Sequence, residues 1–263
     1  MNRIDAKFQE LKRKRRKAFI AFITAGDPVL RTTEALVPAL AQAGADIVEL
    51  GVPFSDPLAD GPVIQASSQR ALTHHVTIEK IFQSVKRIRR KCDVPIAFMT
   101  YYNPVFHYGE ERFVARAKRA GVDGLIVPDL PPEEAIALKQ ACRKQNISLV
   151  FFLSPTTTPS RAKIITQAST GFVYYVSLTG VTGARNTLPK TIADQVRKAK
   201  AGTSKPVCVG FGVSTAAQVK ALSRVADGVI VGSAIVKEIR KHEGKKDLLK
   251  RVSRLVSGLS RGL

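Results

Sequence analysis

The sequence predicts a (β/α)8 barrel, the TIM-barrel class of α/β fold, with an extra N-terminal helix. Its 263 residues contain eight short apolar runs, each followed by a segment with helical apolar spacing. Runs that are apolar on both faces and separated by helices are typical of parallel strands joined by crossovers. Eight such units in about 250 residues close into a barrel. No change in composition marks a boundary, so we expect one domain over residues 1–263.

The predicted helices and strands alternate along the whole chain. Helical spacing begins at once, with Ile4, Phe8 and Leu11 on one face. Pro131-Pro-Glu-Glu134 suits a first helical turn, because proline needs no N–H there and acids favour the positive dipole end. We expect strands at residues 19–24, 46–50, 94–99, 124–127, 148–153, 172–176, 206–209 and 229–231. We expect helices at residues 4–16, 32–43, 62–72, 78–91, 110–120, 131–145, 159–168, 191–200, 215–222 and 234–259.

A doubly wound open sheet is the alternative fold. No Gly-x-Gly-x-x-Gly turn follows the first predicted strand, which disfavours a dinucleotide-binding version of that sheet. In a barrel, functional residues lie at the C-terminal ends of the strands and in the loops after them. The clusters of glycine and proline in this chain fall in those loops.

Charge and cysteine content limit the possible partners and compartment. The net charge is +21, gathered at residues 12–17, 86–91 and 237–251. We interpret these residues as solvated helix faces, because the clusters are separate and few aromatic residues lie near them, so we expect no specific nucleic-acid site. Weak, salt-sensitive binding to polyanions remains consistent with this charge. Three cysteines without metal-ligand spacing, no secretory signal and no membrane-spanning run predict a cytoplasmic protein.

Residues 49–62 contain the strongest candidate for chemistry. Glu49 lies near the end of a buried predicted strand, where a carboxylate must be satisfied or functional. The following loop is rich in proline and glycine and carries a second acid, Asp60, back toward the strand end. The competing interpretations are a structural role for Glu49, bonded to backbone amides, and a helix cap for Asp60. Asp60 could serve both purposes.

Two further loops favour a phosphorylated ligand, and a third is a candidate for closing over substrate. Residues 210–212 follow the seventh predicted strand, and residues 232–236 follow the eighth and begin a helix. Glycines let backbone amides approach an anion, and a helix start adds unpaired N–H groups. Each glycine alone is better explained by a tight turn, but two such loops on adjacent strands favour a ligand. Residues 177–186 form either a loop that closes over substrate or an ordinary connection. The four histidines show no metal-ligand pattern, so we expect no metal.

These motifs together resemble the alpha subunit of tryptophan synthase. The resemblance rests on residues 49–62, 180–183, 210–212 and 232–236, in that order and at similar spacing. It implies a lyase of tryptophan biosynthesis that cleaves indole-3-glycerol phosphate to indole and glyceraldehyde 3-phosphate by a retro-aldol reaction. It also implies no cofactor in this chain and an α2β2 heterotetramer with a beta subunit that carries pyridoxal phosphate.

The resemblance also assigns roles to individual residues. It implies that Glu49 is the general acid and base, that Asp60 binds the indole N–H and that Tyr174 assists Glu49. Phosphate contacts are implied for Gly183, Gly212, Gly232 and Ser233, with Thr182 as a further substrate contact. The indole ring is expected to lie among Phe22, Ile64, Tyr101, Ile126 and Phe211.

Three other functions remain open on the sequence. One is a free-standing lyase that releases indole without a partner. Another is a non-catalytic subunit that binds a phosphorylated ligand and activates a partner enzyme. Other phosphate-binding barrels of tryptophan synthesis share the fold, but the chain lacks an obvious Lys pair or Cys-Asp pair at its strand ends for their chemistry.

Overall fold

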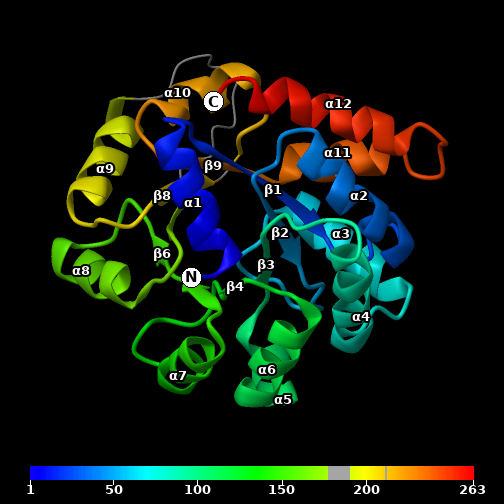
Figure 1. Cartoon of the computed structure of the whole chain (residues 1–263), viewed down its shortest axis with the longest axis horizontal. Helices are drawn as coiled ribbons and strands as arrows, with labels where there is room; N and C mark the ends of the chain where they lie inside the picture. The colour runs from blue at the N-terminus through cyan, green and yellow to red at the C-terminus, as the bar shows by residue number, and fades with distance from the viewer. Residues whose placement is uncertain (177–189, 211) are drawn as a thin grey trace.

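A computed structural model describes residues 1–176, 190–210 and 212–263. In these residues all strand pairs are parallel, and helices surround the sheet (Figure 1). The strands are β1 (Ala18–Thr24), β2 (Ile47–Gly51), β3 (Ile96–Met99), β4 (Gly124–Ile126), β5 (Ser148–Val150), β6 (Phe152–Leu153), β7 (Val173–Val176), β8 (Val207–Gly210) and β9 (Gly228–Val231). The helices are α1 (Arg3–Arg13), α2 (Leu30–Gln42), α3 (Pro62–Thr73), α4 (Ile78–Arg89), α5 (Tyr102–Tyr108), α6 (Glu110–Ala120), α7 (Ile136–Gln145), α8 (Pro159–Ala168), α9 (Lys190–Ala201), α10 (Ala216–Ser223), α11 (Ser233–Lys241) and α12 (Leu248–Ser260).

The sheet closes into a barrel through one interrupted strand. The strand order is β5-β4-β3-β2-β1-β9-β8-β7-β6, so β5 and β6 are its two ends. These two strands flank a single residue, Phe151, within the stretch that the sequence predicts as one strand at 148–153. Residues 148–150 pair with β4 and residues 152–153 pair with β7. The predicted barrel of eight strand positions is therefore confirmed.

Alternation along the strands produces two apolar clusters. The larger cluster lies between the sheet and the surrounding helices and includes Phe19, Leu50 and Phe98. The smaller cluster fills the barrel interior, because it takes the alternate strand positions such as Ile20, Ile47 and Ile230. Side chains of α1 join this inner cluster, so α1 closes one end of the barrel.

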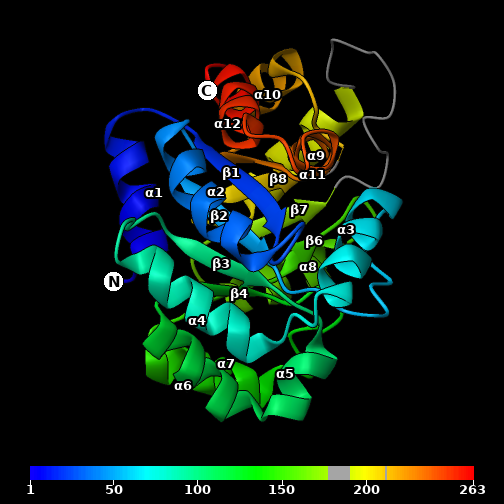
Figure 2. The same cartoon turned by 90° about the vertical axis from the view of Figure 1, so that its right-hand side faces the viewer.

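Polar contacts hold α1 across that end. The Asn2 side chain donates to Ser148 Oγ at 2.7 Å and to the Asp123 carbonyl at 3.2 Å. Arg3 pairs with the Asp123 carboxylate at 3.1 Å. Figure 1 shows α1 lying across the ring of strands, and Figure 2 shows it at one end of the strands with α3 near the other.

Several element boundaries differ from the predicted ones. Helix α5 was not predicted, because Pro104 in a short segment resembles a loop. The predicted helix at 234–259 is two helices, α11 and α12, separated at a turn where Gly244 adopts a φ of 74°. Helix α7 begins at Ile136 rather than at residue 131. No helix of the described residues is long and apolar enough to cross a bilayer.

Candidate active site

Glu49 lies on β2 with its side chain inside the barrel. Strand pairing places it beside Phe22 of β1 and Ala97 of β3. The residue is 1% exposed, and neither carboxyl oxygen has a hydrogen-bond partner among the described residues. Burial, and after it the negative charge of Asp60, raises the pKa of Glu49 from 4.5 to about 8. The group can therefore carry a proton near neutral pH, and the amide-bonded structural role is not what this structure shows.

Asp60 lies in the loop between β2 and α3 and is held by a tyrosine. The Tyr101 hydroxyl, just after β3, donates to Asp60 Oδ2 at 3.1 Å and accepts the Ala59 N–H at 2.9 Å. Its ring stacks on Phe54 with centroids 5.5 Å apart. Asp60 does not cap α3: the N-cap residue is Gly61, and no side chain caps that helix start. The capping role suggested by the sequence is therefore wrong.

The two carboxyl groups have different environments. Burial raises the pKa of Asp60 to about 6, and the hydrogen bond from Tyr101 limits that rise. The Glu49 carboxyl has no comparable bond, and its pKa lies higher. Near pH 7, Asp60 is mainly ionised and Glu49 mainly protonated. Adjacent acids with separated pKa values are suited to different tasks.

Tyr174 on β7 is the third predicted catalytic residue and shares this interior. It is 8% exposed, and its ring lies 4.7 Å from that of Phe152, measured between centroids. Burial raises its pKa well above 10, and the charges of Glu49 and Asp60 raise it further, so the three groups lie close enough to interact. A Cβ on Gly210 of β8 would lie 2.5 Å from the Tyr174 hydroxyl oxygen. Gly210 therefore provides the space for Tyr174.

The Phe22 ring lies between Gly51, on the strand that carries Glu49, and Gly232, which follows β9. A Cβ on Gly51 would lie 2.6 Å from its Cζ, and a Cβ on Gly232 would lie 3.2 Å from its Cδ1. The ring thus occupies space that only glycines leave free at these two strand ends. Gly51 was not among the predicted site residues, and its position directly after Glu49 and Leu50 was the available signal.

The start of α11 has the features expected of an anion site. Gly232 is its N-cap and supplies no side-chain cap, while its carbonyl accepts the N–H groups of Ile235 and Val236. The first N–H groups of a helix lack partners within the helix and carry the positive dipole end. Ser233 occupies the first helical position. Gly212, after the neighbouring strand β8, adopts a φ of 68°, which favours glycine.

The remaining predicted residues divide into two groups. Ile126 is buried in the barrel interior, and Ile64 is partly buried on α3. Thr182, Gly183 and Phe211, and the predicted loop at 177–186, lie outside the described residues.

An ion pair that the sequence analysis missed fixes α3 near this site. Arg70 of α3 donates to both oxygens of Asp27, at 2.9 and 2.8 Å, and Asp27 is 2% exposed. Thr24 at the end of β1 shares a hydrogen bond of 2.6 Å with Ser67, also of α3. An acid directly after a predicted strand, in Gly26-Asp-Pro28, was the signal for this contact.

Neither a cluster of metal ligands among the described residues nor the hollow lined by α1 lies at these acids. Within the described ranges, no three His, Cys, Asp or Glu side chains gather as metal ligands. A hollow of about 490 Å³ lies at the opposite end of the barrel, beside α1. We assign the chemistry to the acids because their pKa values are displaced and Glu49 has unpartnered oxygens.

Comparison with known proteins finds relatives over nearly the whole length of this chain. The family model described as tryptophan synthase alpha chain matches residues 8–262. The tryptophan synthase alpha chain of Geotalea daltonii is 48% identical over 263 residues, covering 100% of this chain and 99% of the relative. That of Geobacter sulfurreducens is 50% identical over 259 residues, covering 98% of both chains.

Solved structures show the same relationship. The crystal structure of tryptophan synthase subunit alpha from Legionella pneumophila has a TM-score of 0.93 and 39% identity, covering 100% of this chain and 98% of the other. A structure described by the mutual activation of the tryptophan synthase α2β2 complex from Pyrococcus furiosus has a TM-score of 0.87 and 43% identity, covering 92% of this chain and 97% of the other. This chain belongs to the tryptophan synthase alpha chain family.

Proposed function

We propose that Glu49 is the general acid and base, and Asp60 the indole-binding carboxylate, in the cleavage of indole-3-glycerol phosphate. The reaction follows from family membership: the chain is a lyase of tryptophan biosynthesis that forms indole and glyceraldehyde 3-phosphate without a cofactor of its own. The observation that carries the residue assignment is the Glu49 carboxyl, which is buried, lacks hydrogen-bond partners among the described residues and has a pKa near 8.

The cleavage needs two proton transfers at opposite ends of one bond. A proton added to indole C3 converts the ring to an iminium cation, which can accept the electrons of the C3–glycerol bond. Removal of the proton from the adjacent glycerol hydroxyl forms the aldehyde as that bond breaks, and its electrons neutralise the ring nitrogen. Glu49 gives the first proton and, once ionised, takes the second, so it ends protonated again.

Asp60 and Tyr174 support these transfers in different ways. Asp60 is mainly ionised near pH 7, so it accepts the indole N–H and stabilises the positive charge that spreads to the nitrogen. Tyr174 remains a neutral hydroxyl, since burial raises its pKa well above 10. We propose that it assists Glu49 as a hydrogen-bond donor.

We propose the substrate contacts that the family resemblance implies. The indole would lie among Phe22, Ile64, Tyr101, Ile126 and Phe211. The phosphate would bind at Gly212, Gly232, Ser233 and Gly183, with Thr182 as a further contact. The support comes from the start of α11 and the close packing of Phe22 against Gly232, which brings the ring wall and the anion site together.

The decisive variant is Glu49→Gln, which keeps the shape of the side chain and removes its proton exchange. We expect kcat for indole release to fall roughly 100-fold or more, because general acid and base catalysis is worth about that much. Asp60→Asn should lower it roughly 10-fold to 1000-fold by removing the charge near the ring nitrogen. Glu111→Gln on the exposed face of α6 is the matched control and should leave the rate unchanged. An unchanged rate in Glu49→Gln would contradict catalysis and favour a regulatory subunit.

We further propose that the chain acts in an α2β2 complex with a pyridoxal-phosphate beta subunit in the cytoplasm, as one domain. The support is its similarity to the Pyrococcus furiosus protein described in such a complex. Indole release measured with and without added beta subunit tests the proposal. Stimulation by the beta subunit is expected, whereas full turnover by the isolated chain would indicate a free-standing lyase.

A further inference from the structure

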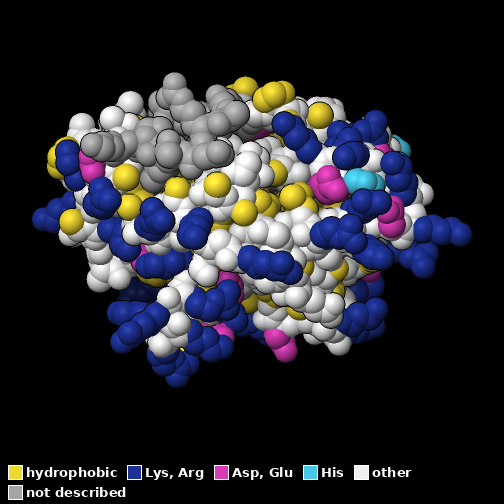
Figure 3. All heavy atoms as spheres, turned by 90° about the horizontal axis from the view of Figure 1, so that it is seen from above, with side chains coloured by type: hydrophobic (Ala, Val, Ile, Leu, Met, Phe, Trp, Pro, Cys, Tyr) yellow, Lys and Arg dark blue, Asp and Glu magenta, His cyan; other side chains and the backbone are white. Residues whose placement is uncertain are grey.

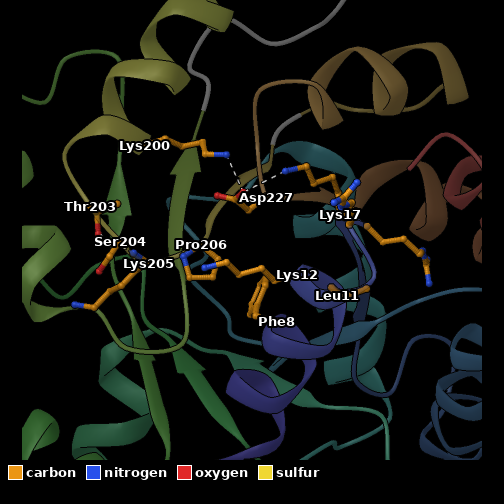
Figure 4. A pocket seen from close by; sticks show the side chains of 12 residues that line it. Phe8, Leu11, Lys12, Lys17, Lys200, Thr203, Ser204, Lys205, Pro206 and Asp227 are labelled. Atoms are coloured by element: carbon orange, nitrogen blue, oxygen red, sulfur yellow. Dashed lines mark hydrogen bonds and ion pairs between the residues drawn. The ribbon is translucent and has the colours of Figure 1, made fainter.

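The hollow beside α1 is built from three segments that are far apart in the sequence. One wall is the end of α1 and the link to β1, a second runs from the end of α9 to β8, and Asp227 just before β9 completes the lining (Figure 4). Its volume of about 490 Å³ is within the usual range for small-molecule sites. None of its residues belongs to the proposed cleavage site. The lining residues are Phe8, Leu11, Lys12, Arg15, Arg16, Lys17, Lys200, Thr203, Ser204, Lys205, Pro206 and Asp227.

The lining is strongly cationic. Six of the lining side chains are Lys or Arg, and the only carboxylate among them is Asp227. Asp227 Oδ1 lies 2.7 Å from Lys200 Nζ and 3.4 Å from Lys17 Nζ, and its Oδ2 accepts the Val207 N–H. Lys12 and Arg15 have no carboxylate at ion-pair distance among the described residues. The hollow therefore has uncompensated positive charge.

Helix ends account for only part of this charge. Lys12 and Lys200 lie in the last turns of α1 and α9, where a cation is favoured by the helix dipole. Arg15, Lys17 and Lys205 lie outside both helices, and nothing in the helix dipole requires them. Lys205 donates to the carbonyls of Thr166 and Gln167, which holds one side of the hollow in place.

The hollow also has an apolar floor and nearby hydroxyl groups. Phe8, Leu11 and Pro206 form apolar lining, and Phe8 packs on Phe172 with ring centroids 5.8 Å apart. Thr203 and Ser204 add hydroxyls on the wall that carries Lys205. Cations, hydroxyls and apolar surface together suit an anion with an organic body.

We propose that this hollow binds a small anion that carries two or more phosphate groups and an apolar body, the chemistry of a nucleoside diphosphate. The phosphates would lie against Lys12 and Arg15, the cations without carboxylate partners, and the body against the floor. The competing explanation is diffuse attraction by the whole surface, since Lys and Arg side chains are spread over the face that Figure 3 shows.

Isothermal titration of the purified chain with ADP and with inorganic pyrophosphate, at about 0.1 M salt, separates these explanations. The test variant is Lys12→Gln/Arg15→Gln. The matched control is Lys86→Gln/Arg90→Gln, which removes two exposed cations at the end of α4, a helix packed between α2 and α6. Each variant loses two positive charges, and unchanged indole release shows that each is folded.

We expect binding of both probes to weaken about tenfold or more in the test variant, since hydrogen bonds to charged groups are lost. The control should change it less than about twofold, because Lys86 and Arg90 do not line the hollow and salt screens exposed charges. Tighter binding of ADP than of pyrophosphate supports a ligand with an organic body. Equal weakening in both variants, or binding that the test variant does not alter, contradicts a site in the hollow. A further result would contradict the proposal: a single-stranded oligonucleotide that binds the chain more tightly than either probe, with the control variant weakening that binding as much as the test variant does.

Discussion

Glu49 and three acids at the α1 end of the barrel differ in what their oxygens contact. Asp46 accepts the Phe19 N–H, Asp123 the Ile96 N–H and Asp227 the Val207 N–H. Each of these aspartates precedes its own strand and bonds the backbone at or near the beginning of a neighbouring one. They therefore secure strand ends, whereas both Glu49 oxygens lack partners among the described residues. That difference leaves Glu49 available to exchange protons with a substrate.

The pH dependence of indole release should report both site acids. Asp60, with a pKa raised to about 6, must be ionised, so kcat/KM should rise as pH increases through that value. Glu49, with a pKa raised to about 8, must begin protonated, so kcat/KM should fall as pH increases through that value. The two carboxyl groups interact, so the apparent pKa of each limb of the profile belongs to the pair and not to one residue. Asp60→Asn should abolish the acidic limb and keep the alkaline one, and a wild-type profile without an alkaline limb would contradict the role of Glu49.

The sequence singles out the two acids but not the groups that surround them. Residues 49–62 are distinctive enough to single out Glu49 and Asp60 without coordinates. The part played by Gly210 depends on β7 lying beside β8 in the register that brings Tyr174 opposite Cys208. From the sequence, Gly210 belongs only to a candidate phosphate-binding turn, since a local motif carries no information about a neighbouring strand.

At the scale of elements, α3 is positioned by contacts to the end of β1. Asp27 is almost fully buried and bound at both oxygens by Arg70, whose side chain is 23% exposed. The pair connects the turn after β1 to the helix that follows Asp60 and carries Ile64. The loop that carries Asp60 is therefore attached to a helix that is fixed on the barrel.

Arg70→Met should destabilise the chain by about 2 to 4 kcal/mol at pH 7, because it leaves the Asp27 carboxylate buried without its partner. Burial already raises the pKa of Asp27, and loss of Arg70 raises it further, so the folded chain takes up a proton there more readily as pH falls. The destabilisation should therefore be smaller at about pH 5. Denaturant unfolding at both pH values measures it. Arg197→Met, from a pair whose side chains are both 62% exposed, is the control and should have little effect. An equal loss of stability in the two variants would contradict the importance of the buried pair.

Element positions were predictable where apolar periodicity determines them. All eight strand positions and most helices lie where the apolar spacing indicates. The interruption at Phe151 was not predictable, because the division of that strand between two partners arises only on closure of the barrel. Helix α5 was missed for a local reason, since its start at Tyr102 has no side-chain cap and Pro104 follows.

At the scale of the whole molecule, the described residues at the two ends of the barrel make different kinds of contact. At one end, α1 and the paired aspartates secure the strands, and the cationic hollow lies beside them. Further along the strands, Glu49 and Asp60 share the interior with Tyr174, and Phe22 reaches the glycine at the start of α11. Cleavage of the substrate accounts for the group of Glu49, Asp60, Tyr174 and Phe22, but it does not account for the net charge of +21. The proposed anion site would give a function to part of that positive charge.

Proton transfer by Glu49 to the indole ring requires that the folded barrel keep this carboxyl protonated near neutral pH. Carbon-13 NMR of the labelled glutamate carboxyl groups, with the signal of Glu49 assigned by its loss in Glu49→Gln, measures this directly. We expect a titration midpoint near 8, because the carboxyl is buried without a partner among the described residues and lies near Asp60. A midpoint near the ordinary value of 4.5 would mean that Glu49 is ionised at neutral pH and cannot deliver the first proton.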